Sequence, residues 1–243
     1  MKETKAAAQA ARKAGKAILS YWGRNKGVTM KGRANFLTKA DLASQRIIIR
    51  ELKHFGHGVL AEENVDRPGE LTWVIDPLDG TTNFSRENPH FCVSIALVGR
   101  EPLAGVIYDP MLNELFVAEQ GKGAFLNGTR MRVSKTNALD RALFATEFSP
   151  YMDDAERRKS VECVRQIIGN RRVFRNTGSA ALDLAYIAAG RFDAYFQFSL
   201  KPWDYSAGLV LIPEAGGVAE IAGRLIVASN GTLHGGFKNW LML

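Results

Sequence analysis

The sequence contains little cysteine and no long apolar segment. Only two cysteines occur among 243 residues, Cys92 and Cys163, far apart and each within an apolar pattern. Their spacing excludes a disulfide framework and a cysteine metal site, and it predicts two buried thiols in a reducing compartment. No run of about 18 apolar residues occurs, so we expect no membrane span. The first residues carry helically spaced charges without a signal-peptide core, which predicts a cytoplasmic protein.

The composition also lacks the extremes that mark disordered or nucleic-acid-binding chains. Charged residues make up 23% of the chain and apolar residues 46%, which are ordinary globular values. The net charge of +7 attracts anions, but the basic residues form only short clusters, at 157–159 and 171–175. The first cluster adjoins acidic residues, as on a solvated helix face. An anionic small substrate explains the excess charge more simply than nucleic acid, which we do not expect as a partner.

The first half of the chain combines two helices with a series of strands. Residues 3–22 and 41–54 have apolar residues at helical spacing, with Asp41 as the expected N-cap of the second helix. Short apolar segments between residues 58 and 134 follow one another with Gly, Pro and Asn turns. This pattern predicts a mainly antiparallel sheet.

From about residue 140 strands and helices alternate, which is typical of an α/β arrangement. Helices are expected at 153–168, 179–190 and 203–215, with a last one near the C-terminus. We therefore predict one α/β chain, softly divided into residues 1–137 and 138–243, because no flexible linker marks the boundary.

Carboxylates follow the apolar strands at several points. Asp76 ends the strand in "TWVIDPLDGTTNF" (72–84), and Asp79 follows in a turn. Glu62 ends the strand in "GVLAEEN", and Asp204 lies in the first turn of the helix begun by "KPWDYSAG". If the strands are neighbours, these acids meet at one sheet edge and repel one another unless a cation holds them. Oxygen ligands of this kind suit Mg²⁺.

The residues after Asp79 add a candidate phosphate site. Gly80 allows a tight turn, and Thr81 and Thr82 then begin a helical turn whose free N–H groups attract anions. Taken alone, "DPLDG" could equally be an ordinary strand-exit turn. Together with Glu62 and Asp204 it indicates metal-assisted phosphoryl chemistry.

These motifs resemble the inositol monophosphatase family. "AEEN", "WVIDPLDGTTNF" and "KPWDYSAGLVLIPEAGG" match its three signatures, and "TKAD", "GKGAFLNG" and "GSAALDLAYIAAGRFDAYF" are also found in the expected order. The resemblance implies a five-layer αβαβα sandwich of the inositol monophosphatase and fructose-1,6-bisphosphatase type, usually a homodimer. It also implies a Mg²⁺-dependent, lithium-sensitive phosphatase with two to three ions in each site.

The resemblance assigns metal ligands residue by residue. Glu62, Asp76 and the carbonyl of Leu78 would hold one ion, and Asp76, Asp79 and Asp204 would hold a second. A third, weaker ion would lie beside Glu62. Glu62 and Asp76 thereby count as catalytic, and Leu78, Asp79 and Asp204 also surround the substrate phosphate.

The resemblance further assigns the attack on phosphorus. Thr81, supported by Asp41 of "TKAD", would orient or deprotonate the attacking water. The amides of Gly80 and Thr81 would bind the phosphate, and Glu63 is a secondary candidate. None of the four histidines matches a catalytic position, and only His90 is near the site.

On the substrate side, the resemblance implies that Gly178, Ser179 and Ala180 line the hydroxyl-bearing part of the ligand. Arg175 matches a substrate-contacting arginine of bacterial relatives. The sequence departs from the family at Gln197, where well-studied members carry a glutamate that accepts bonds from sugar hydroxyls. A glutamine keeps one acceptor, adds donors and loses the charge, which weakens the case for strict inositol selectivity.

The leading prediction is therefore a myo-inositol-1-monophosphatase acting on a small phosphorylated polyol or sugar. A broad sugar phosphatase that also cleaves fructose 1,6-bisphosphate is the nearest alternative, with Arg175 and Arg191 as candidate cations for the second phosphate. A nucleotide phosphatase would need an adenine pocket, for which no signal is found, and histidinol phosphate is a further option. An accessory protein that binds RNA or RNA polymerase is the alternative from another class.

Overall fold

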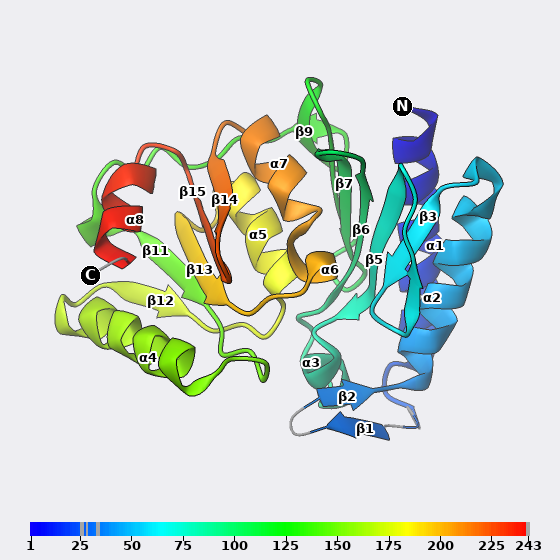
Figure 1. Cartoon of the computed structure of the whole chain (residues 1–243), viewed down its shortest axis with the longest axis horizontal. Helices are drawn as coiled ribbons and strands as arrows, with labels where there is room; N and C mark the ends of the chain where they lie inside the picture. The colour runs from blue at the N-terminus through cyan, green and yellow to red at the C-terminus, as the bar shows by residue number, and fades with distance from the viewer. Residues whose placement is uncertain (25–26, 28, 33–34, 242–243) are drawn as a thin grey trace.

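Helices and sheets stack in five layers, in the order helix, sheet, helix, sheet, helix (Figure 1). The computed structural model describes residues 1–24, 27, 29–32 and 35–241. Helices α1 (Lys2–Tyr21) and α2 (Lys39–Leu52) pack together on the outer face of an eight-stranded sheet. The predicted αβαβα architecture is confirmed.

The eight-stranded sheet has the strand order β10-β9-β8-β7-β6-β5-β3-β4. Every neighbouring pair is antiparallel except β3 and β5, which run parallel with Ala61 opposite Ile75. The next residues along the two strands, Glu62 and Asp76, therefore lie at neighbouring positions, as the sequence analysis predicted for neighbouring strands. The strands are β3 (Gly58–Ala61), β4 (Val65–Arg67), β5 (Thr72–Asp79), β6 (Cys92–Val98), β7 (Pro102–Asp109), β8 (Glu114–Glu119), β9 (Gly123–Leu126) and β10 (Thr129–Arg130).

The second sheet has five strands in the order β12-β11-β13-β15-β14. Its first three strands are parallel and its last two pairings antiparallel. The carboxyl ends of β11 and β13 consequently lie at the same edge of the second sheet. The strands are β11 (Leu143–Thr146), β12 (Val173–Arg175), β13 (Ala194–Phe198), β14 (Val218–Ala222) and β15 (Leu225–Ser229); β1 (Thr29–Gly32) and β2 (Asn35–Leu37) pair separately.

The remaining helices fill the central layer and the far outer layer. In the central layer, α7 packs against β7 and β8 while α5 reaches β13 and β15, and α4 and α8 cover the second sheet's outer face (Figure 1). The helices are α3 (Thr81–Ser85), α4 (Asp154–Gly169), α5 (Ala180–Ala188), α6 (Pro202–Tyr205), α7 (Gly208–Glu214) and α8 (His234–Leu241), with short 3₁₀ turns at Lys53–Phe55 and Leu139–Arg141.

Two sequence-based expectations for the helices were wrong in detail. The N-cap of α2 is Thr38, not Asp41, because the Thr38 side chain accepts the amide of Ala40. Asp41 takes the third position and accepts the Thr38 amide in return, which completes a capping box. The single helix expected at 203–215 is divided into α6 and α7.

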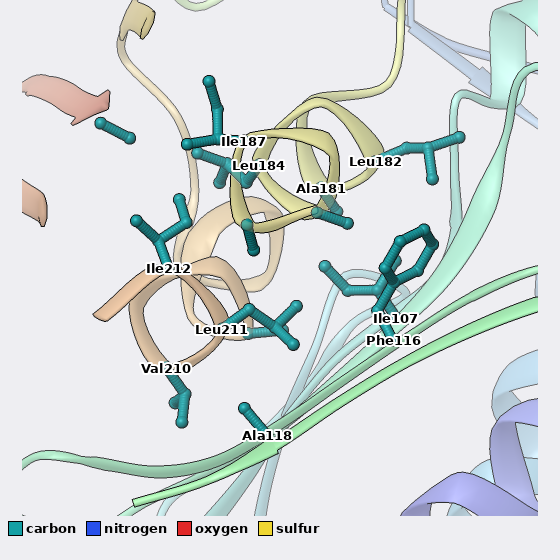
Figure 2. Close-up of a cluster of buried hydrophobic side chains, with 14 of the residues drawn as sticks. Ile107, Phe116, Ala118, Ala181, Leu182, Leu184, Ile187, Val210, Leu211 and Ile212 are labelled. Atoms are coloured by element: carbon teal, nitrogen blue, oxygen red, sulfur yellow. The ribbon is translucent and has the colours of Figure 1, made fainter. Parts of the chain in front are cut away.

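The central apolar layer joins the two sheets. Figure 2 shows side chains of α5 and α7 meeting Ile107 of β7 and Phe116 of β8, all within one buried cluster. Helix α7, from the second half of the chain, packs against β7 and β8 of the first sheet. The predicted division near residue 137 stays a prediction. Among the described residues, no helix has the length and apolar character needed to cross a membrane.

Candidate active site

A β-bulge in β5 places Asp76 and Asp79 together. Residues three apart on a strand normally point to opposite faces. In the pairing with β6, Asp76 lies opposite Ser94 and Asp79 opposite Cys92, so three steps on β5 match two on β6. Such an extra residue re-aims the side chains that follow it, and both carboxylates reach the same site.

Asp204 completes a cluster of three carboxylates. It lies in α6, and one carboxylate oxygen from each of Asp76, Asp79 and Asp204 lies within 4.8 Å of the other two. Opposite oxygens around an octahedral Mg²⁺ are about 4.2 Å apart, from bond lengths of roughly 2.1 Å. The oxygens therefore fit one hard cation.

The electrostatics of the cluster favour a bound cation. Burial raises the pKa of Asp76 well above its ordinary value, and the charges of Glu62, Asp79 and Asp204 raise it further. Burial, Asp79 and Glu62 likewise raise the pKa of Asp204. Like charges in such a site cannot all ionise cheaply without a counter-ion. The three carboxylates form the hard oxygen donor set that Mg²⁺ prefers, and these residues would hold the ion.

Glu62 lies beside the cluster without belonging to the set of three oxygens. It directly follows β3, and its amide donates to the carbonyl of Ile75 at 3.2 Å. Its charge is the largest electrostatic contribution to the raised pKa of Asp76. Metal ligation by Glu62 stays a prediction, because the three oxygens within 4.8 Å of one another do not include one from Glu62.

We expect Mg²⁺ to stabilise the protein more strongly at pH 8 than at pH 5.5. Carboxyl groups with raised pKa values bind protons more tightly when folded, so the metal-free protein loses stability as the pH rises above about 4. Mg²⁺ reverses that loss by favouring the ionised groups, and protons compete with it at low pH. At about 100 times Kd, the melting temperature should rise by roughly 5–10 °C at pH 8.

Thermal melts with and without Mg²⁺ at the two pH values test this expectation. Glu162→Gln, on an exposed part of α4, should shift as the unmodified protein does. A Mg²⁺-induced shift that is absent at pH 8, or larger at pH 5.5, would contradict the assignment of the cluster.

The Thr81 hydroxyl lies within hydrogen-bond distance of both Asp41 and Leu78. The hydroxyl oxygen is 3.0 Å from Oδ1 of Asp41 and 2.9 Å from the carbonyl of Leu78. A hydroxyl has one proton and can donate it to only one of these oxygens at a time. Burial raises the pKa of Asp41 to about 6, although hydrogen bonds from Thr38 lower it. At neutral pH Asp41 is therefore mainly ionised and accepts the hydrogen bond from the Thr81 hydroxyl.

Asp79 receives its hydrogen bonds from the second half of the chain. Its Oδ2 accepts the Ser179 hydroxyl at 2.6 Å and the Ala181 amide at 2.8 Å. The buried Cys92 thiol lies 3.8 Å from the same oxygen. The residues at the start of α5, in the second half of the chain, thus orient the Asp79 carboxylate of β5, in the first half.

Gly80 and α3 are closely surrounded. Gly80 has φ +88°, and a Cβ there would lie 2.9 Å from the carbonyl of His90 and 3.2 Å from that of Gly178. Both the conformation and the space require glycine. Asn83 of α3 donates from Nδ2 to His90 and Thr177 carbonyls at 2.8 Å, so α3 is fixed beside the start of α5. Phosphate binding by the Gly80 and Thr81 amides stays a prediction.

A cavity of about 1170 Å³ opens onto the cluster. Of the sequence-predicted site residues, those that line it are Asp79, Gly178, Ala180, Gln197 and Asp204. Ser179 is fully buried behind this wall. Further predicted site residues that are not among the lining residues are Asp76, which belongs to the cluster, and Asp41, Glu62, Leu78, Gly80 and Thr81.

The arginines predicted from sequence do not line this cavity. Arg175 ends β12 and donates to the carbonyl of Phe174 at 3.0 Å, while Arg191 forms two hydrogen bonds with Glu114. The arginine that does line the cavity is Arg157 of α4. Substrate contact by Arg175 stays a prediction.

Sequence reasoning missed both Arg157 and Glu147, which line the cavity. Arg157 was assigned to a solvated helix face. Glu147 was missed although it directly follows β11, in the same way that Glu62 follows β3. The search for strand-end carboxylates would have found it. His90 is not a lining residue, and its Nε2 lies 3.8 Å from Asp183.

Comparison with known proteins agrees with the fold and shows the family. The sequence model of the inositol monophosphatase family matches residues 2–235. The Nus factor SuhB of Escherichia coli K12 is 44% identical over 223 residues, covering 88% of this chain and 83% of that protein. The inositol-1-monophosphatase of Rhizobium meliloti is 42% identical over 217 residues, covering 86% and 81%.

Solved structures show the same relationship. The extragenic suppressor protein SuhB of Bartonella henselae matches with a TM-score of 0.91 at 36% identity, covering 98% of this chain and 97% of that one. The Thermotoga maritima IMPase matches with a TM-score of 0.90 at 33% identity, covering 100% and 97%. The family model and these structures identify the chain as a phosphatase of the inositol monophosphatase type. The chain belongs to the inositol monophosphatase family.

Proposed function

We propose that this protein is a Mg²⁺-dependent phosphomonoesterase that hydrolyses inositol 1-phosphate. The observation that carries the proposal is the cluster of Asp76, Asp79 and Asp204, with one oxygen from each within 4.8 Å of the other two, beside a large cavity. Catalysis of phosphoryl transfer consists mainly of charge neutralisation and positioning. The relative named inositol-1-monophosphatase, at 42% identity, supports the same substrate.

In this proposal, Asp76, Asp79 and Asp204 would hold Mg²⁺, which would supply charge neutralisation at the phosphate and activation of water. The chain's own residues bind and orient. Asp79 is held rigidly by Ser179 and Ala181, so its free oxygen keeps a fixed direction. Ionised Asp41 accepts the hydrogen bond that the Thr81 hydroxyl donates, so a lone pair of the Thr81 oxygen can accept a hydrogen bond from water and orient it.

Phosphate release tests the proposal directly. Inositol 1-phosphate, fructose 1,6-bisphosphate and 3′-phosphoadenosine 5′-phosphate are compared with Mg²⁺ present and after chelation. We expect Mg²⁺-dependent release, with inositol 1-phosphate preferred at least about tenfold, or roughly 1.4 kcal/mol in the transition state. Release from none of the three would contradict the proposed activity.

A broader sugar phosphatase is a second candidate, and Arg157 favours it. This arginine lines the cavity; its Nη2 donates to the carbonyl of Met152 at 3.0 Å, and its acidic partner, Asp154, is 3.6 Å away and well exposed. An arginine with so weak a partner can take a second phosphate. Similar rates on inositol 1-phosphate and fructose 1,6-bisphosphate would support this candidate.

The relatives named Nus factor SuhB favour an accessory role as well. The net charge of +7 permits contact with RNA, and such a role need not use the acidic site. RNA binding that falls with salt and persists in an Asp76→Asn variant would support it.

A further inference from the structure

The start of helix α5 is held by two carboxyl groups from other parts of the chain. Ser179 occupies the N-cap position, but its side chain makes no capping hydrogen bond to its own helix. The Ala181 amide, which an N-cap side chain would normally accept, donates instead to Asp79 of β5. Glu147, directly after β11, accepts the Gly178 and Ser179 amides, each at 2.7 Å. One acid from each sheet therefore fixes this helix start.

Ser179 joins the two carboxyl groups directly. Its amide donates to Oε1 of Glu147 at 2.7 Å, and its hydroxyl donates to Oδ2 of Asp79 at 2.6 Å. Ser179 is fully buried, and hydrogen bonds of buried groups are costly to break. Any shift of the Ser179 backbone away from Glu147 also moves the hydroxyl that orients Asp79.

The bonds to Glu147 do not depend on its charge. Burial, followed by the charges of Asp183 and Asp79, raises the pKa of Glu147 well above its ordinary value, which favours the protonated acid. A protonated carboxyl group keeps acceptor capacity on its oxygens, so Oε1 accepts the two amides with or without the proton. A glutamine offers the same acceptor at the same distance from the backbone.

We infer that Glu147 is a positioning residue for the metal site: it fixes the start of α5 and, through Ser179, the direction of the Asp79 carboxylate. The inference rests on the proposed Mg²⁺-dependent function and adds a residue outside the acidic cluster on which metal affinity depends. Groups that orient a metal ligand typically contribute 10- to 100-fold to metal affinity or activity. Because Glu147 acts through Ser179, we expect the lower end of this range.

Glu147→Ala removes the acceptor for both amides. We expect the Kd for Mg²⁺, measured by calorimetric titration of the metal-free protein with Mg²⁺ alone, to rise about tenfold. The Mg²⁺ concentration that gives half the maximal rate of phosphate release should rise by the same factor. Saturating Mg²⁺ should recover most of kcat, because Glu147 does not act on the substrate in this role.

Two conservative variants separate position from charge. Glu147→Gln keeps the length and the acceptor and removes the charge, so its Kd for Mg²⁺ should equal that of the unmodified protein. Glu147→Asp keeps the acid but withdraws it from the two amides, so its Kd should rise. Glu147→Asp also serves if Glu147→Ala does not fold.

Glu214→Ala is the matched control. Glu214 of α7 likewise accepts two backbone amides, those of Gly121 and Gly123, each at 2.6 Å, and it does not line the cavity. Its loss should lower the melting temperature and leave the Kd for Mg²⁺ unchanged. Adding Glu147→Ala to Ser179→Ala should raise Kd little further, because both changes act through one contact.

Each outcome decides the inference. A rise in Kd for the alanine and aspartate variants, with glutamine unchanged, supports it. An unchanged Kd in Glu147→Ala, or an equal rise in Glu147→Gln, overturns it. If the unmodified protein binds Mg²⁺ but releases phosphate from no ester, the proposed function fails while the titrations still decide the role of Glu147. If the unmodified protein binds no Mg²⁺, the inference fails.

Discussion

Asp76→Asn should reduce kcat by at least about a thousandfold and leave the protein folded. Asp76 is 2% exposed, and its pKa is raised by burial and by three neighbouring acids. Asparagine keeps an oxygen for the Leu78 amide, which Asp76 accepts at 3.0 Å, but removes the charge that the cation needs. A metal ion contributes several kcal/mol to stabilising the transition state, and each 1.36 kcal/mol is a factor of ten.

Melting in the presence of a chelator distinguishes loss of chemistry from loss of fold. Removal of one buried like charge should leave the metal-free melting temperature unchanged or higher. Asp109→Asn is a suitable control, because Asp109 is another buried acid at a strand end, bonded to the amides of Met111 and Leu112 and absent from the cavity wall. Near-normal turnover by Asp76→Asn would show that the metal assignment is wrong.

Thr81→Val should lower kcat by roughly 10²- to 10⁴-fold, the usual contribution of a positioned proton acceptor. Valine is close to threonine in shape but has no hydroxyl, so water loses the oxygen that Asp41 orients. Kinetics at saturating Mg²⁺ measure the effect. The thermal shift with Mg²⁺ should persist, because the hydroxyl is not an expected ligand.

Thr81→Ser provides the comparison, since it restores the hydroxyl and should recover most of the rate. In the unmodified protein, kcat should also fall as the pH drops below about 6, where Asp41 gains a proton. A valine variant with unchanged kcat would remove Thr81 from the mechanism.

The acids of the site could be predicted from sequence because each follows a recognisable local signal. Asp76 comes directly after an apolar run and Asp204 follows a proline that begins a helix, so both could be recognised, although β5 continues past Asp76 to Asp79 and does not end where the sequence predicted. The sequence did not predict how Asp76 and Asp79 come to lie on the same side of β5. The spacing of Asp76 and Asp79 gives no sign of the bulge that puts both on one side, because the extra residue is defined by the pairing with β6.

Contacts between distant segments escaped prediction for the same reason. Glu147 accepts amides thirty-one and thirty-two residues away, at Gly178 and Ser179, and no local pattern encodes such a pairing. The α2 cap was misassigned because Thr38 and Asp41 are both good capping residues. Only geometry shows that Thr38 caps the helix and Asp41 is left to meet Thr81.

The bonding of Asp79 also limits how this enzyme can move. A hinge between the two sheets would have to break the Ser179 and Ala181 bonds to Asp79 and strand a buried carboxylate. Opening of the interface and loss of the metal site would then be one event. We therefore expect substrate and product to pass through the existing mouth of the cavity, and not between layers that have parted.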